Sequence, residues 1–525
     1  MKSTGAVLAV FVMLGAAIMP AQARSSFGDY VRAARALQEG RLDEARALLD
    51  ALSKAASDDP ETKYLAAEIA FLEGDYPGAL ALLSAMSDAR GKELARDLLP
   101  LVSATLEATR GFLRRESEHF VFSYPAGKDE VLVDVAAEAL EAACKQIGED
   151  LGYLPSAKVR VEILPRPTDL ARVSTLTEKE IETSGTIALS KYNKLMIVSP
   201  RATLLGYPWL DTLAHEYTHY VVTALSADNV PIWLHEGIAK FQETRWRASP
   251  GAVGLSRTHA HLLAVASKKG RLIRFEEMHP SMAKLPSQEA AATAFAEVYT
   301  MVAWLHHKVG YEGIRSVIEK IRDGRTERRA IAEVLGFPWA RAESEWKDYL
   351  RKLDLKEPSR SKVSMPLRFR KGRDDGDENV GLDQVSEEKA RKHARLGGLL
   401  RARGRFGPAA LEYEKALAIT GPDNPFLAGK LARTYLDMGE PRRAVEAALP
   451  LSNRDEEDAY PQATLGAAYL ELGDAQKAEQ HLGAALRISP FDPAVRCALA
   501  EVYAATGRSA LATRETAACR MLRGI

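Results

Sequence analysis

The central part of the chain, from Glu118 onward, mixes two periodicities of hydrophobic and polar positions. Apolar residues recur with helical spacing over residues 130–151. Alternation with a period of two, and a polar turn at 191–194 between apolar stretches, predict strands and a β-hairpin at 119–124, 159–164, 186–189 and 195–198. Pro208 suits the first turn of a following helix. The central region is therefore expected to combine a small sheet with helices.

Helical segments on both sides of this region repeat with a period of 34 or 35 residues. A glycine marks each period, with a small residue seven positions before it and another five positions after it. These glycines are Gly40, Gly74, Gly404, Gly439, Gly473 and Gly507. Small residues let antiparallel helices approach closely, and glycine relieves the turn between them. The unit from Leu465 to Pro490 resembles the tetratricopeptide repeat, so two repeats are expected before the central region and four after it.

Tetratricopeptide repeats stack into a superhelix whose concave groove binds peptide or protein, so a protein partner is expected there. Residues 354–385 interrupt the pattern with prolines and mixed charges, and they predict a flexible linker. Because the groove is expected to lie far from the central region, removal of the chain from Glu387 onward should weaken partner binding and leave chemistry in that region intact.

The helix after Pro208 carries the sequence His215-Glu216-Tyr217-Thr218-His219. Histidines at positions i and i+4 lie on one helix face, so two imidazole nitrogens can converge on one metal ion. Glu216, next to the first histidine, can reach a metal-bound water. A second predicted helix, opened by Pro231, offers Glu236 as a third ligand.

This motif, followed by Trp233-Leu234-His235-Glu236-Gly237-Ile238-Ala239, resembles the signature of gluzincin metallopeptidases. Residues 116–353 look like the bacterial peptidase MA-like domains found beside tetratricopeptide repeats. The resemblance implies a Zn²⁺ ion held by His215, His219 and Glu236, with Glu216 as the general base that activates water against a peptide bond. The expected fold is multidomain: an α+β gluzincin-like catalytic domain flanked by all-α tetratricopeptide-repeat superhelical segments.

Three nearby residues leave alternatives open. Glu243 is either a rival ligand or, as we favour, a residue that supports a ligand. His235 stands where gluzincins often have Asn, and it either hydrogen-bonds a ligand histidine or faces solvent. The resemblance matches Tyr299 to a tyrosine that faces zinc and stabilises the oxyanion, although an aromatic residue at helical spacing is also a normal core residue.

The leading functional hypothesis is a zinc metallopeptidase that acts on a peptide or protein. The alternative is a binding scaffold built on the repeats, with a vestigial peptidase domain. Hydrolysis of a non-peptide amide by the same zinc water also stays open. The intact ligand set and the intact Glu216 favour activity.

Composition narrows the classes of binding partner that are expected. The 71 basic and 71 acidic residues give a formal net charge of zero, which argues against nucleic acid or an anionic membrane as the main partner. The only cysteines are Cys144, Cys497 and Cys519. Buried free thiols are expected, and a Cys497–Cys519 bridge across a helical hairpin is the alternative.

The N-terminus predicts export. Lys2, the apolar residues 6–19 and the sequence Ala21-Gln22-Ala23 form a signal peptide with cleavage after Ala23, and an uncleaved anchor is the alternative. The mature protein is then periplasmic or extracellular, with no membrane span after cleavage. The predicted organisation is signal peptide 1–23, N-terminal repeats 26–112, catalytic domain 116–353, linker 354–385 and C-terminal repeats 386–525.

Overall fold

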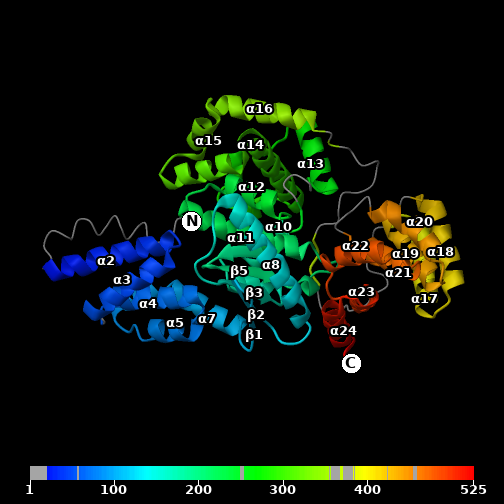
Figure 1. Ribbon diagram of the computed structural model, residues 1–525, viewed down its shortest axis with the longest axis horizontal. Coiled ribbons are helices and arrows are strands. Elements are labelled where there is room, and N and C mark those ends of the chain that lie inside the picture. Colours follow the sequence, from blue (N-terminus) through cyan, green and yellow to red (C-terminus); the bar gives the residue numbers. More distant parts are fainter. Residues whose placement is uncertain are drawn as a thin grey trace.

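The computed structural model describes residues 21–55, 58–248, 254–353, 355, 367–370, 382, 385–422, 424–452 and 458–525. Figure 1 shows N-terminal helices, a central region of helices and strands, and C-terminal helices, in that order along the chain. Most of the predicted signal peptide and of the predicted linker lies outside the described residues. Ala21, Gln22 and Ala23 form the start of the first described helix.

The N-terminal helices are α2 (Ala21–Gln38), α3 (Leu42–Ala55), α4 (Pro60–Glu73), α5 (Tyr76–Ser84), α6 (Ala89–Ala95) and α7 (Leu98–Ala108). Among them α2 pairs with α3 and α4 with α5, as the two predicted repeats require, and α6 and α7 pack on α4 and α5. Gly74 ends α4 with a left-handed φ of 87°, and the Asp75 side chain then caps α5 by accepting from the Gly78 N–H. The marker glycine therefore allows the turn between paired helices.

The sheet has the strand order β1-β2-β3-β5-β4. Its strands are β1 (Leu113–Glu116), β2 (Phe120–Tyr124), β3 (Val159–Leu164), β4 (Ala188–Lys191) and β5 (Lys194–Val198). β2, β3 and β5 are parallel, and the outer strands β1 and β4 are antiparallel to their neighbours. The predicted strands and the hairpin are confirmed. β1 was not predicted, because all four of its residues are exposed and show no apolar alternation.

The central region surrounds the sheet with helices on both of its faces. The helices of this region are α8 (Glu130–Leu151), α9 (Pro167–Arg172), α10 (Glu178–Ser184), α11 (Trp209–Ser226), α12 (Ile232–Gln242), α13 (Arg257–Lys268), α14 (Gln288–Arg322), α15 (Glu327–Leu335) and α16 (Trp339–Lys352). Val161 of β3 and Leu195 of β5 join the main core together with residues of α8 and α11. Their neighbours Leu164 and Met196 belong to a separate cluster with α9 and α10. The sheet therefore separates two apolar layers, as the period of two requires.

A buried ion pair attaches the N-terminal helices to the second face of the sheet. The Lys194 ammonium is fully buried, 2.7 Å from Glu162 Oε2 and 2.8 Å from the Tyr76 hydroxyl oxygen. Tyr76, in α5, also donates to the Glu162 carboxylate. Since both charges are paired and hydrogen-bonded, their burial is tolerated, and loss of either would leave the other unpaired.

The C-terminal region forms four helix pairs, as predicted. The helices are α17 (Glu388–Ala402), α18 (Phe406–Thr420), α19 (Pro425–Asp437), α20 (Pro441–Ser452), α21 (Ala459–Glu471), α22 (Ala475–Leu486), α23 (Pro493–Ala505) and α24 (Ser509–Arg523). Among described residues of the predicted linker, Phe369 forms a β-bridge with Thr203, and Arg370 N–H donates to Ala202 O. This short segment therefore lies against the central region.

The last repeats are part of the central core, which corrects the expectation that the repeats lie apart from it. Leu482, Leu499 and other residues of α22–α24 belong to the same apolar cluster as the sheet and α11. The Trp209 indole N–H, at the start of α11, donates to Leu486 O at 3.1 Å. A Cβ on Gly206 would lie 2.1 Å from Ile488 O, so only glycine permits this approach. Removal of the chain from Glu387 onward would therefore expose the core of the central region.

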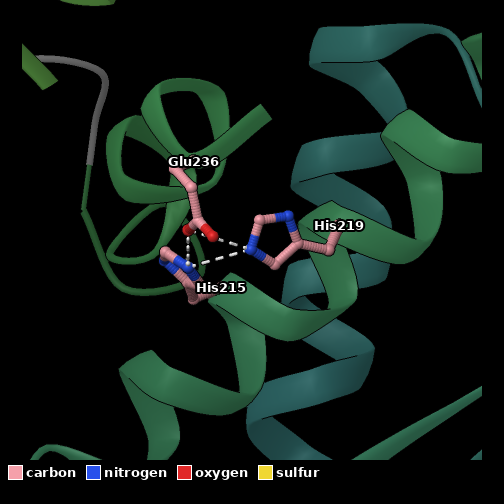
Figure 2. A group of neighbouring side chains, drawn as sticks. All are labelled: His215, His219 and Glu236. Carbon is pink, nitrogen blue, oxygen red and sulfur yellow. Dashed lines mark hydrogen bonds and ion pairs between the residues drawn. The ribbon is translucent and has the colours of Figure 1, made fainter. Parts of the chain in front are cut away.

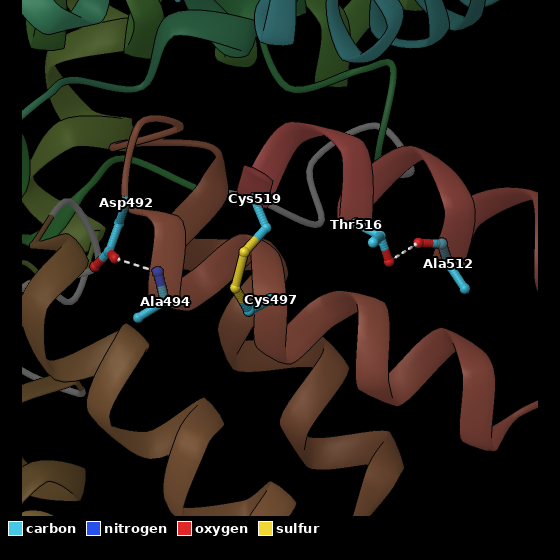
Figure 3. The surroundings of a disulfide bond; sticks show 6 residues. All are labelled: Asp492, Ala494, Cys497, Ala512, Thr516 and Cys519. Carbon is cyan, nitrogen blue, oxygen red and sulfur yellow. Dashed lines mark hydrogen bonds between the residues drawn. A yellow bond between two sulfur atoms is a disulfide. The ribbon is translucent and has the colours of Figure 1, made fainter. Parts of the chain in front are cut away.

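Cys497 and Cys519 form a disulfide between α23 and α24, with their Cα atoms 5.3 Å apart (Figure 3). The expectation of free thiols is wrong for these two residues, because pairing of α23 with α24 brings them face to face. It is confirmed for Cys144, which is free and buried. In the described ranges, no helix is both long enough and apolar enough to cross a bilayer.

Arg496 fastens the terminal repeat to α8. Its guanidinium is 1% exposed, lies 2.7 Å from Glu515 Oε2 and donates to Val131 O at 3.0 Å. Arg496→Ala should destabilise the protein by about 3 kcal/mol, because the buried Glu515 carboxylate loses its partner at Oε2 and keeps only Arg514 at Oε1.

The solvent-exposed pair Arg508–Glu479 supplies a matched control. Arg508→Ala should cost no more than about 1 kcal/mol, because exposed ion pairs contribute little. Thermal unfolding of wild type and both variants measures the difference, and equal losses in the two variants would contradict the role assigned to Arg496.

Candidate metal centre

The backbone between α11 and α12 brings the two helices together. α11 ends in two consecutive left-handed residues, Ala227 (φ 52°) and Asp228 (φ 57°), and Pro231 precedes α12. α12 also lies close to α14: a Cβ on Gly237 would meet Val302 Cγ2 at 2.8 Å and Val298 O at 2.9 Å. Glycine after Glu236 is therefore required for α12 to approach this closely.

His215, His219 and Glu236 converge on one point between these helices (Figure 2). The two histidine Nε2 atoms are 3.1 Å apart, and Glu236 Oε2 lies 3.2 Å from each of them. The structure thus brings together the three ligands matched by resemblance. Both histidine side chains are more than four-fifths buried, as is that of Glu236.

The three donor atoms suit a small tetrahedral cation. With ligand bonds of about 2.0 Å, tetrahedral zinc separates its ligand atoms by about 3.3 Å, close to the observed triangle. Two imidazole nitrogens and one carboxylate oxygen are also a common catalytic zinc donor set, and they leave a fourth position for water or substrate.

The charges of the triangle favour a cation as well. Burial works to lower the pKa of His215, but hydrogen bonds with Glu236 and Glu243 outweigh it and raise that pKa to about 10. Burial works to raise the pKa of Glu236, but His219 and His215 outweigh it and hold that pKa well below its usual range. The carboxylate is therefore stabilised as an anion that faces two nitrogens.

Glu216 lies beside the triangle with only 6% of its surface exposed. Burial raises the pKa of its carboxyl group, although His219 and His215 act in the opposite direction. The carboxyl group also accepts a hydrogen bond from the backbone of Ser190 in β4. β4 is an edge strand that packs against α11, so this hydrogen bond holds the Glu216 carboxyl group from outside its own helix.

Glu243 and His235 both contact the outer sides of the triangle histidines. Glu243 Oε2 lies 3.4 Å from Nδ1 of His215, the nitrogen that faces away from the triangle, and Glu243 is also paired with Lys240 at 2.6 Å. This position fits the favoured supporting role of Glu243 and places its carboxylate outside the triangle. His235 is buried, and its Nδ1 contacts Nδ1 of His219, so it hydrogen-bonds a candidate ligand and does not face solvent.

Tyr299 lies half-buried against Phe241, with ring centroids 5.9 Å apart. Burial, together with Tyr349 and Glu243, raises the pKa of its hydroxyl to about 12. The aromatic ring that α14 places against His215 is Phe295, one turn earlier, with centroids 6.1 Å apart. Phe295 was not predicted from the sequence. Its spacing of four residues from Tyr299, which places both on one helix face, could have indicated it.

A second His/Glu group, Glu118, His119 and Glu141, also comes together among the described residues. Here Glu141 accepts from the His119 N–H at 2.8 Å and from the Ser117 hydroxyl at 2.6 Å. Glu118 is exposed. These bonds give the group a structural role in holding the β1–β2 turn against α8.

Comparison with solved structures finds likenesses with low TM-scores. MamA is 26% identical over 24% of this chain and 74% of its own, with a TM-score of 0.22. The thermophilic tetratricopeptide-repeat protein TTC0263 of Thermus thermophilus is 27% identical over 25% of this chain and 74% of its own, with a TM-score of 0.24. The Cut9–Hcn1 tetramer of APC/C is 12% identical over 94% of this chain and 78% of its own, with a TM-score of 0.26. TM-scores this low support no argument about the whole fold or about function.

Family models give the clearer result, whereas the comparison with curated proteins found no match. Residues 139–352 match the model of the Peptidase MA superfamily. Residues 36–99, 459–484 and 493–516 match tetratricopeptide repeats. The chain therefore joins a Peptidase MA superfamily domain, which carries the candidate metal centre, to tetratricopeptide repeats on both sides.

Proposed function

We propose that the protein is a zinc-dependent metallopeptidase that is exported and acts on a peptide or protein. The observation that carries the proposal is the buried triangle of His215, His219 and Glu236 with Glu216 beside it. A zinc ion in this triangle would supply Lewis acidity, which lowers the pKa of a coordinated water to about 7.

The side chains around the triangle have separate tasks in this proposal. Glu216 accepts a proton from the attacking water and passes it to the leaving amine. The burial of Glu216 and its raised pKa suit this role. His215 and His219 present Nε2 to the metal, because Glu243 and His235 occupy the Nδ1 sides. Phe295 excludes water from one side of His215.

In this proposal the substrate backbone binds along the edge strand β4. Its outer edge has no strand partner among the described residues, so an extended peptide can pair there, and pairing through main-chain hydrogen bonds tolerates varied side chains. Since β4 also packs on α11, a peptide paired there would pass next to Glu216.

The scaffold function remains the second candidate, and an observation in the repeats favours partner binding. A cavity of about 220 Å³ is lined by Arg401, Lys430, Arg433 and Tyr460, with residues from the starts of α21 and α23. It lies among the first helices of successive repeats, where tetratricopeptide grooves bind protein segments. Both candidates accommodate this cavity, and hydrolysis distinguishes them.

Export is part of the proposal and draws support from the disulfide. Disulfides persist in oxidising compartments such as the periplasm or the cell exterior. Cys497 and Cys519 form one in the terminal repeat.

Purified protein should bind about one zinc ion per chain. His215→Ala or His219→Ala should each remove most of the bound metal, because each deletes one of three ligands, while circular dichroism of the repeat helices stays unchanged. Metal analysis after zinc loading checks this. Folded wild-type protein without zinc would contradict the metal assignment.

Glu216→Gln should keep the metal and the fold, because Glu216 is not among the three ligands and the side chains are nearly isosteric. It should lower peptide hydrolysis by about 10²–10⁴-fold, because the proton acceptor is lost. Hydrolysis of a diverse peptide library by zinc-loaded wild type and variant measures this effect. Equal residual hydrolysis by the two proteins would favour the scaffold function.

The mature protein should begin at or near Arg24, because cleavage is expected after Ala23. N-terminal sequencing of protein recovered from the periplasm or medium checks this. A chain that still begins at Met1 in the cytoplasm would contradict export.

A further inference from the structure

His235 sits directly behind one of the proposed ligands. Its ring lies edge to edge with that of His219, with centroids 4.6 Å apart and an interplanar angle of 23°. The two Nδ1 atoms are in hydrogen-bond contact. On its other side, His235 Nε2 lies 3.3 Å from the Thr223 hydroxyl oxygen. The side chains of Thr223, His235 and His219 therefore form a continuous chain that ends at the metal triangle.

This chain fixes where the protons reside. A metal ligand must present an unprotonated nitrogen, so with Nε2 of His219 facing the triangle, its proton resides on Nδ1. Nδ1 of His219 then donates, and Nδ1 of His235 must accept. The remaining ring proton of His235 is on Nε2, where the Thr223 hydroxyl can accept it.

The two candidate ligand histidines are thus supported by different chemistry. Behind His215 stands Glu243, an anion neutralised in part by Lys240. Behind His219 stands an uncharged imidazole. Because a neutral acceptor adds no negative charge, orientation and tautomer are what His235 can contribute to His219.

We propose that His235, held by Thr223, is a positioning residue that orients His219 and fixes its tautomer for metal binding. The inference rests on the proposed function, since it requires zinc at His215, His219 and Glu236. It assigns the effect to the hydrogen bond between the two Nδ1 atoms and not to the space that the His235 ring fills.

Two substitutions of His235 separate these contributions. Asn places its amide oxygen at the position of the histidine Nδ1, so His235→Asn keeps an acceptor for His219 and loses the ring. Phe keeps an aromatic ring to fill the space and offers no acceptor. His235→Phe should weaken zinc binding by about 10–100-fold, and His235→Asn should stay within about threefold of wild type.

Thr223 provides a second, independent pair. Thr223→Val removes the hydroxyl at nearly constant shape and should weaken zinc binding by about 3–10-fold, because His235 loses its outer partner. Thr223→Ser keeps the hydroxyl and should match wild type. His481→Asn is the matched control: His481 stacks on Tyr469 and hydrogen-bonds Gln462 within the repeats, so its loss should not alter zinc affinity.

The measurements are the zinc dissociation constant, by competition with a chelator, and the visible spectrum of the cobalt-loaded proteins, which reports ligand geometry without any need for activity. A weakened His235→Phe with an altered cobalt spectrum, beside a near-normal His235→Asn, supports the proposal. A His235→Phe protein that binds zinc like wild type overturns it, as does a Thr223→Val protein that equals wild type if His235→Phe does not fold. Wild type that binds no zinc refutes the proposed function itself and the inference with it.

Discussion

The candidate site depends on one constraint: a buried helix, α11, carries polar side chains that need partners. His215, Glu216 and His219 face the interior, where an unpartnered polar group is costly. α12 supplies Glu236 and His235, and β4 supplies a backbone hydrogen bond to Glu216. The left-handed turn after Ser226 and the absence of a side chain at Gly237 make that arrangement possible.

The repeats on both sides of the Peptidase MA domain are attached to it by buried polar contacts. On the N-terminal side, Tyr76 joins the buried Lys194–Glu162 pair. On the C-terminal side, Arg496 pairs with Glu515 and reaches the backbone of α8. Each contact is buried and polar, so it constrains the relative position of its partners more tightly than apolar packing alone would. The repeats are thereby held in fixed positions against the Peptidase MA domain.

Much of this was predictable from local pattern. Periodicity predicts the strands β2 to β5, the paired repeat helices and α11, called here the HEYTH helix after the motif His215–His219. The residues that define each of these elements are neighbours in sequence. Glu236 was reached through the motif that surrounds it. β1 was missed because its exposed residues carry no apolar signal. Docking of the last two repeats was missed because the contact of Trp209 with Leu486 joins residues 277 positions apart. Cys497–Cys519 pairing was left open, since cysteine spacing alone does not set helix orientation.

That long-range contact also has a consequence for biosynthesis. A ribosome makes the HEYTH helix well before it makes the last two helix pairs, yet these complete the apolar core around the start of α11. During vectorial synthesis the Peptidase MA domain therefore stays incomplete, with Trp209 lacking its final neighbours, until the C-terminus emerges. Closure of so long a loop is slow, and the nascent chain exposes apolar surface meanwhile. The core around the HEYTH helix is thus closed only in a chain that extends through α24.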